Sequence, residues 1–266
     1  MVYFSHNILS MGIYNITKIN HLLQSWPQGT VATPYWLEQQ GISRSLQSHY
    51  QKSQWIESIG TGAFKRAGSV IGWKGGLYAI QKQLGLSIHV GGLTSFILQN
   101  SGHYVRFKET IQLFGTANTK APLPRWFRDY QWQEEITFYR TNFLPENMAL
   151  KEYEDKNFNI TISTLERAML ECLYLAPQYI DLVECYHLME GLAGLRPDIL
   201  QELLAACSSV KVKRLFLYMA EKASHTWLQY LDTKSVDIGK GKRSLVKNGI
   251  YNSKYAITLT KELTYI

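Results

Sequence analysis

Apolar side chains recur at helical spacing through the first fifth of the chain. The first predicted helix covers residues 13–28, and its apolar stripe is Ile16, Ile19, Leu22 and Leu23. Thr33 can cap a second helix whose first position is a proline, and Gly41 ends that helix. Ser43 then caps a third helix over residues 43–53. The second and third helices are joined by a tight turn, which is typical of a helix-turn-helix.

The pattern changes from helical to alternating after residue 53. Residues 55–59 alternate between two faces, and Gly60-Thr61-Gly62 then interrupts the alternation. Such a pattern predicts a β-hairpin with a glycine turn. A helix-turn-helix closed by a hairpin is a winged helix, so we predict a winged-helix DNA-binding domain over residues 13–68.

The third predicted helix has one side that is free to meet DNA. At about 100° per residue, Leu46 and Tyr50 face inward and the opposite side carries no carboxylate. Its cations, amides and hydroxyls are groups that bind base edges and phosphates. The predicted DNA-binding residues are Arg44, Ser45, Gln47, Ser48, Gln51 and Lys52 on this helix, and Thr61, Lys65 and Arg66 on the hairpin. The alternative is an ordinary solvated helix face.

The chain after residue 68 mixes helical and alternating segments. Helices are expected at 68–85 and 93–100, and then from Thr164, at 178–190, 197–207 and 210–223. Strands are expected at 104–107, 110–114, 136–139, 158–163, 236–238, 244–246 and 256–259. Two nearby prolines predict a loop at 118–127. The predicted fold class is therefore α+β, with a mixed α+β domain over residues 69–266.

Short stretches in two parts of the chain share a likeness to known sequences. The N-terminal stretches are Gly41-Ile-Ser-Arg, Tyr50-Gln-Lys-Ser, Trp55-Ile-Glu, Ile59-Gly and Gly62-Ala-Phe-Lys-Arg. The C-terminal stretches are Ser163-Thr-Leu-Glu-Arg-Ala-Met-Leu-Glu, Met189-Glu-Gly-Leu, Leu195-Arg-Pro, Leu203-Leu-Ala-Ala-Cys, Ser209-Val-Lys-Val-Lys-Arg-Leu-Phe-Leu, His225, Trp227-Leu, Gly239-Lys-Gly-Lys-Arg and Tyr255-Ala-Ile-Thr. Together they resemble the AbiEi family, the antitoxins of type IV (abortive-infection) toxin–antitoxin systems. Residues 70–160 match this family less obviously.

The resemblance implies a function and partners. A member of this family is expected to repress its own antitoxin–toxin operon by binding double-stranded DNA at repeats in the promoter. Its C-terminal antitoxin domain is expected to counteract a nucleotidyltransferase-like toxin, without needing a stable complex with that toxin. This chain is not itself such a toxin, because its Gly68-Ser69 is not followed by the paired aspartates that hold Mg²⁺.

Charge is distributed unevenly along the chain. The formal net charge is +7, yet up to Arg128 there are twelve lysines and arginines against three glutamates and no aspartate. This basic excess coincides with the predicted helix-turn-helix and favours a polyanionic partner. No apolar run reaches the length of a membrane span, and no signal peptide is recognisable. The three cysteines have no close pairing, so we expect reduced thiols and a cytoplasmic protein.

Two basic clusters mark a second candidate surface for antitoxin action or phosphate binding. Lys211, Lys213 and Arg214 fall in the first turn of a predicted helix, where a bound anion would relieve their conflict with the helix dipole. Lys240, Lys242, Arg243 and Lys247 form the second cluster, on a loop interrupted by glycines. The alternative for both clusters is a solvated basic face.

Catalysis has little support in the sequence. The seven histidines lack metal-ligand spacing, and no nucleophile motif is present, so we expect no catalytic site, metal or cofactor. One competing reading is a metal-dependent nuclease that uses the acidic runs at Glu134-Glu135 or at Glu152, Glu154 and Asp155. The other is a generic winged-helix regulator whose C-terminal domain binds a small effector or RNA. A downstream toxin gene would argue against the generic regulator.

Overall fold

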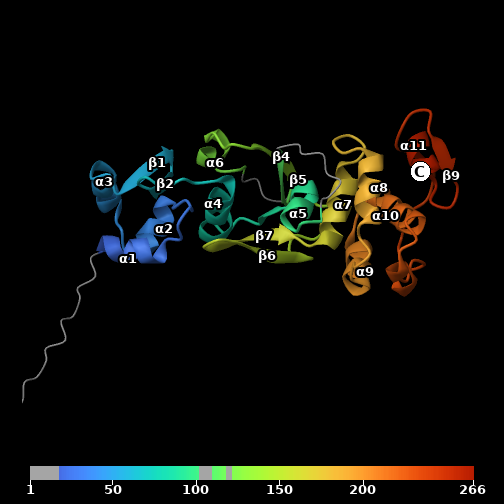
Figure 1. Ribbon diagram of the computed structural model, residues 1–266, viewed down its shortest axis with the longest axis horizontal. Helices are drawn as coiled ribbons and strands as arrows, with labels where there is room; N and C mark the ends of the chain where they lie inside the picture. The colour runs from blue at the N-terminus through green and yellow to red at the C-terminus, as the bar shows by residue number, and fades with distance from the viewer. Residues whose placement is uncertain (1–17, 102–109, 118–121) are drawn as a thin grey trace, which may run out of the picture.

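The computed structural model describes residues 18–101, 110–117 and 122–266. Figure 1 shows an elongated molecule, with the N-terminal helices at one end, a five-stranded sheet in the middle and the C-terminal helices at the other end. Buried side chains form three hydrophobic clusters along this length. The fold class is α+β, as the sequence predicts. The domain boundary after residue 68 stays a prediction, because Ala63 and Trp73 on either side of it pack in one cluster.

The N-terminal part is a helix-turn-helix followed by a two-stranded wing. Its elements are α1 (Lys18–Ser25), α2 (Pro34–Gln39), α3 (Arg44–Lys52), β1 (Ile56–Gly60) and β2 (Ala63–Arg66). Both predicted caps are present, since the Thr33 hydroxyl accepts from Trp36 N and the Ser43 hydroxyl from Leu46 N. The buried side chains of this part include Leu22, Trp26, Leu37, Ile42, Tyr50 and Ile56.

The central sheet has the strand order β5-β4-β3-β7-β6. Its strands are β3 (Ile88–Val90), β4 (Thr110–Gly115), β5 (Glu135–Arg140), β6 (Leu150–Asp155) and β7 (Phe158–Ser163), and the surrounding helices are α4 (Trp73–Tyr78), which continues as a π-helix (Ala79–Gln83), α5 (Gly92–Leu98) and α6 (Arg125–Asp129). The pairs β3–β7 and β4–β5 are parallel, and β3–β4 and β6–β7 are antiparallel. The predictions for β4, β5, β7, α4 and α5 are confirmed.

Some sequence predictions for the middle of the chain fail or fall elsewhere. The strand expected at 104–107 lies outside the described residues. Within the loop expected at 118–127, α6 begins directly after Pro124, because a proline before the first helical residue removes no helical hydrogen bond. Strands β3 and β6 were not predicted, although β3 lies at the centre of the sheet.

The C-terminal part is built around α7, which packs against α5, α8, α9 and α10. Its elements are α7 (Leu165–Leu175), α8 (Leu182–Glu190), α9 (Pro197–Ala206), α10 (Val210–Lys222), a 3₁₀ helix (Thr226–Tyr230), β8 (Arg243–Ser244), β9 (Ile250–Asn252), β10 (Ile257–Leu259) and α11 (Lys261–Tyr265). The four predicted helices are confirmed. The strand expected at 236–238 is wrong, because Val236 is buried without any ladder partner and Asp237 instead accepts a hydrogen bond from Gly239 N.

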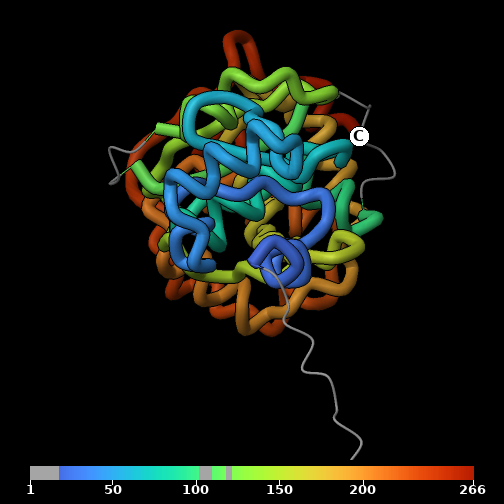
Figure 2. The backbone as a smooth tube through the Cα atoms, turned by 90° about the vertical axis from the view of Figure 1, so that its left-hand side faces the viewer, coloured from blue at the N-terminus to red at the C-terminus, as the bar shows by residue number. Residues whose placement is uncertain are grey.

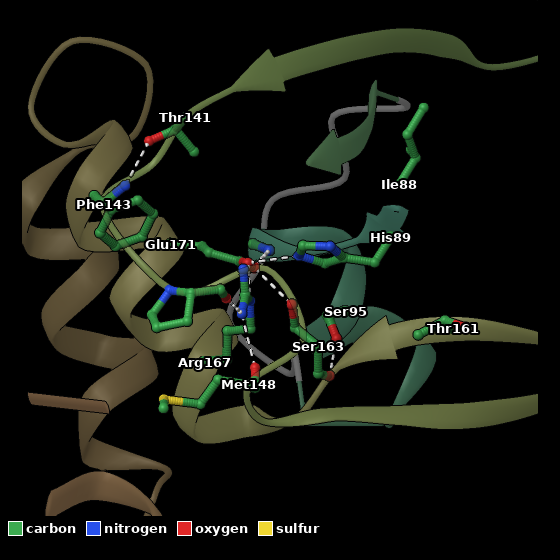
Figure 3. A network of polar contacts seen from close by, with 12 residues as sticks. Ile88, His89, Ser95, Thr141, Phe143, Met148, Thr161, Ser163, Arg167 and Glu171 are labelled. Atoms are coloured by element: carbon green, nitrogen blue, oxygen red, sulfur yellow. Dashed lines mark hydrogen bonds and ion pairs between the residues drawn. The ribbon is translucent and has the colours of Figure 1, made fainter. Parts of the chain in front are cut away.

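A buried charged network joins the central sheet to α7 (Figure 3). Glu171 accepts from Arg167 Nε and the Ser163 hydroxyl, each at 2.8 Å, and from Gly92 N at 3.0 Å. His89 Nε2 lies 2.8 Å from the same carboxylate. Burial raises the pKa of Glu171, but its contacts with His89 and Arg167 outweigh burial, so that this pKa is lowered. Burial lowers the pKa of His89, so a neutral imidazole faces an ionised carboxylate at neutral pH.

The winged helix is fastened to the central part by main-chain contacts. Val31 N donates to Gly75 O, and the Gln83 side chain bonds Thr33 N and Val31 O, each at 2.8 Å. A Cβ at Gly75 would lie 2.0 Å from Gly29 O, so only glycine allows this approach. In Figure 2, viewed along the long axis, the N-terminal helices and the wing cover the near end of the molecule.

Candidate nucleic-acid interface

The outer face of α3 is solvent-exposed and rich in hydrogen-bond donors. Arg44, Ser48 and Lys52 are exposed and lie four residues apart, so they form one row along the helix. Ser45 and Gln51 are exposed as well, as predicted. His49 is exposed on the same helix but is not among the predicted DNA-binding residues. In the described part of the chain, the residues of α3 include no carboxylate.

Arg44 is held by a neighbouring acid on α2. Its Nε lies 2.5 Å from Glu38 Oε1, and 64% of the Arg44 side chain is exposed. An exposed ion pair of this kind contributes little stability, typically below about 1 kcal/mol. Its effect here is geometric, because the Nε atom is engaged while the terminal Nη atoms have no partner among the described residues.

Gln47 does not belong to the exposed face, and that prediction is wrong. Its side chain is only 3% exposed, and its Nε2 donates to Pro34 O at 3.1 Å and Ile42 O at 2.9 Å. Gln47 lies three residues before the buried Tyr50 and therefore on the inner side of α3. Its amide closes the turn between α2 and α3 by satisfying two main-chain carbonyls.

Only some of the DNA-binding residues predicted on the wing are exposed. Thr61 is exposed at the tip, between Gly60 and Gly62, which both have positive φ. Lys65 Nζ lies 3.0 Å from Glu57 Oε2 and donates to Ser69 O. Its ammonium is thus already paired within the wing.

Arg66 binds the wing to α1 and does not reach outward. Its Nη2 donates to Leu23 O at 2.6 Å, and its guanidinium lies 5.8 Å from the Trp26 ring centroid. Burial lowers the pKa of Arg66, which accords with a partly desolvated site. Both Lys65 and Arg66 thus have partners within the N-terminal part, and their predicted contacts with DNA stay a prediction.

The first basic cluster of the C-terminal part is internal. Lys211 Nζ donates to Tyr174 O and Ala176 O, each at 2.6 Å, and burial lowers its pKa. Lys213 is 6% exposed and Arg214 is 1% exposed. The guanidinium of Arg214 donates to four main-chain carbonyl oxygens. The prediction of an exposed anion site at the start of α10 is wrong, because Lys213 and Arg214 are buried and main-chain carbonyls accept the hydrogen bonds of Lys211 and Arg214.

The second basic cluster is at the surface. Lys240, Lys242, Arg243 and Lys247 are all exposed. They take part in no ion pair within the described residues. Figure 1 places the adjoining strand β9 at the end of the molecule farthest from α3.

Two acids of the second acidic run are paired with lysines. Glu152 pairs with Lys82 at 3.1 Å, and Asp155 pairs with Lys74 at 2.9 Å. Among residues 18–101, 110–117 and 122–266, no three histidines, cysteines or acids lie close enough together to hold a metal ion. The three cysteines are buried free thiols, and burial raises the pKa of each. Within the same residues, no helix has the length and apolarity of a membrane span.

Comparison with known proteins gives two family matches. A model described as "Transcriptional regulator, AbiEi antitoxin N-terminal domain" matches residues 15–107. A model described as "Transcriptional regulator, AbiEi antitoxin, Type IV TA system" matches residues 108–260. No protein with a curated description matches significantly.

One similar solved structure is that of the RV2827C protein from Mycobacterium tuberculosis. The two chains superimpose with a TM-score of 0.56 at 12% sequence identity, over 90% of this chain and 88% of that chain. At this identity the similarity concerns the fold alone.

Proposed function

Because this chain belongs to the AbiEi family of transcriptional regulators, the antitoxins of type IV toxin–antitoxin systems, we propose that α3 reads operator DNA in the promoter of its own antitoxin–toxin operon. The observation that carries this proposal is the exposed row of Arg44, Ser48 and Lys52 on a helix without carboxylates. A helix of this size fits the major groove of B-DNA, where such side chains read base edges and neutralise phosphates.

The docking that we propose assigns a role to each exposed group. Arg44 enters the groove first, with its Nη atoms free for the O6 and N7 acceptors of a guanine while Glu38 holds its Nε. Ser45, Ser48, His49 and Gln51 line the same helix face, and Lys52 meets the backbone. On the wing, Thr61 contacts the backbone or minor groove beside the site. Gln47, Lys65 and Arg66 keep the helix and wing in position.

The second half of the proposal concerns the toxin. The C-terminal antitoxin domain counteracts a nucleotidyltransferase-like toxin, and it does so without a stable complex between the two proteins. Support comes from the match of residues 108–260 to an antitoxin family. We expect the residues that counteract the toxin to be exposed ones such as Lys240 and Lys242, because the cluster at Lys211 is internal.

Two cell-based measurements test these halves separately. A reporter under the chain's own upstream region should be repressed by the wild type and by Lys234→Ala, an exposed lysine outside the interface. Repression should be lost in Arg44→Ala/Lys52→Ala. Growth rescue from the co-expressed toxin should survive in that double variant. An unrepressed reporter with folded wild-type protein would refute autoregulation, and absence of rescue by the wild type would refute the antitoxin role.

A further inference from the structure

The loop of residues 238–243, here called the glycine loop, has an unusual backbone. Gly239 and Gly241 have φ of 65° and 82°, whereas Lys240 and Lys242 are not in the left-handed region. A Cβ at Gly239 would also lie 2.9 Å from Val210 Cγ2, so a glycine is required there by both φ and packing. Alternation of the sign of φ along a chain turns successive N–H groups toward one side, forming an anion-binding concavity called a nest.

Arg214 holds the carbonyl side of this loop from beneath. Its Nε donates to Ile238 O and its Nη1 to Gly241 O, each at 2.8 Å, and its Nη2 donates to Gly239 O at 3.1 Å. A further bond at 3.0 Å runs to Ala256 O, just before β10. Because Arg214 is 1% exposed, these bonds fix the loop to the core of the C-terminal part. The carbonyls point inward and are satisfied.

The N–H groups of this loop are mostly unpaired in the described residues. Within the described residues, the N–H groups of Lys240, Gly241 and Lys242 have no acceptor. The N–H of Gly239 is already taken by Asp237 Oδ1 at 2.8 Å, and Asp237 is the acid that adjoins the loop. Three successive exposed residues therefore carry N–H groups without a partner in the described part of the chain, next to the exposed cations.

The surroundings of these N–H groups are cationic and aromatic. Lys240, Lys242, Arg243 and Lys247 are exposed, and the Lys242 ammonium lies 5.0 Å from the ring centroid of Tyr251. The Tyr251 side chain is 41% exposed on the neighbouring strand β9. Cations beside a flat exposed ring are the combination that binds the phosphates and unpaired bases of single strands.

We propose that the glycine loop binds the backbone of single-stranded RNA, with one phosphate on the N–H groups of Lys240–Lys242 and a neighbouring base on Tyr251. The exposed ring favours a single strand over a duplex, whose bases are already stacked on one another. The site lies at the opposite end of the molecule from α3 (Figure 1), so it is a second nucleic-acid site. This inference does not depend on operator binding by α3.

The test is a fluorescence-anisotropy titration of the full chain with a labelled unstructured 12-nucleotide RNA. Three proteins are compared with the wild type: Lys240→Gln/Lys242→Gln, Tyr251→Ala and the matched control Lys234→Gln/Lys261→Gln. Every substituted lysine is exposed, and none makes a hydrogen bond or ion pair within the described residues, so folding should be unaffected. Because α3 is identical in all four proteins, differences between them report on the glycine loop. A 12-base-pair duplex DNA of unrelated sequence and inorganic phosphate serve as competitors.

The expected result is that RNA affinity falls about tenfold or more in both Lys240→Gln/Lys242→Gln and Tyr251→Ala but not in the control. The magnitude of the slope of log affinity against log salt should fall by about 1.4 in the double lysine variant, which loses two ammonium groups that each neutralise a backbone phosphate, at about 0.7 each. Equal RNA affinity in the double lysine variant and the control would overturn the site. Loss in the lysine variant with no change in Tyr251→Ala, together with equal competition by duplex DNA or phosphate, would overturn the assignment to single strands.

Discussion

Replacing Glu171 by Gln should destabilise the junction between the central sheet and α7. The variant keeps the shape of the side chain but leaves the Arg167 cation, which is 4% exposed, without its counter-ion. It also places an NH₂ group where donors now converge from His89, Ser163 and Gly92. Removing one partner of a buried ion pair costs about 3–5 kcal/mol. We expect about 3 kcal/mol here, because Arg167 keeps the carbonyls of residues 145 and 148.

Urea denaturation followed by circular dichroism measures this loss. With an m value near 3 kcal/mol/M, a loss of about 3 kcal/mol lowers the midpoint by about 1 M. Glu202→Gln on α9 is the matched control, since Glu202 is exposed, and its free energy of unfolding should change by less than about 0.5 kcal/mol. A Glu171→Gln variant whose free energy of unfolding lies within about 1 kcal/mol of the wild type's would show that the Glu171–Arg167 ion pair does not stabilise this junction.

The same network sets a dependence of stability on pH. The folded-state pKa of Glu171 is lowered, so its ionised carboxylate stabilises the folded state above about pH 4.3. This stabilisation is lost as the pH falls through the folded-state pKa. The folded-state pKa of His89 is also lowered, so the unfolded chain gains a proton first and stability begins to fall below about pH 6.5. Glu171→Gln should therefore show a shallower loss than the wild type below about pH 4.3. An identical acid profile would show that Glu171 is not the titrating group.

Three further predictions concern other parts of the molecule. Gly75→Ala should lower the free energy of unfolding by about 1–3 kcal/mol or more, because the new Cβ pushes the winged helix away from the central part. Gly194→Ala is the control, since open space surrounds its Cβ and the urea midpoint should change little. Equal midpoints for the two variants would contradict this prediction. Gln47→Ala should lower the free energy of unfolding by about 1–3 kcal/mol, because Ile42 O loses its donor and Pro34 O loses its side-chain donor; a urea midpoint equal to the wild type's would contradict a structural role of Gln47. The buried cysteines should react with a thiol reagent only upon unfolding, and rapid labelling of the native protein would contradict their burial; they are Cys172, Cys185 and Cys207.

The predictable part of the fold is the part with strong local signals. Long amphipathic helices such as α10, and the caps at Thr33 and Ser43, follow from spacing and side-chain chemistry alone. Strand β3 has only three residues, which are too few to display a period. Its central residue is a histidine, a polar residue that does not indicate a buried strand. Strand β6 carries mostly charged side chains because it is an edge strand of the sheet.

Buried polar side chains are the part of the site that could not be predicted from the sequence. The exposed residues of α3 follow from the helix period, but Gln47 and Arg214 resemble surface residues in the sequence. Both are buried because main-chain carbonyls elsewhere in the fold need donors, and such carbonyls leave no local trace in a sequence. The backbone of the glycine loop, with positive φ at Gly239 and Gly241, likewise required the structure.

The measurement that tests the account most directly is the affinity of the full chain for its own upstream DNA and for a scrambled duplex, at several salt concentrations. Operator reading by α3 predicts a preference of about 10³ or more for the upstream DNA, which Arg44→Ala removes, and affinities for both duplexes that weaken with salt. Equal and weak binding to the two duplexes, unchanged by Arg44→Ala, would contradict it and leave α3 as part of a merely basic surface.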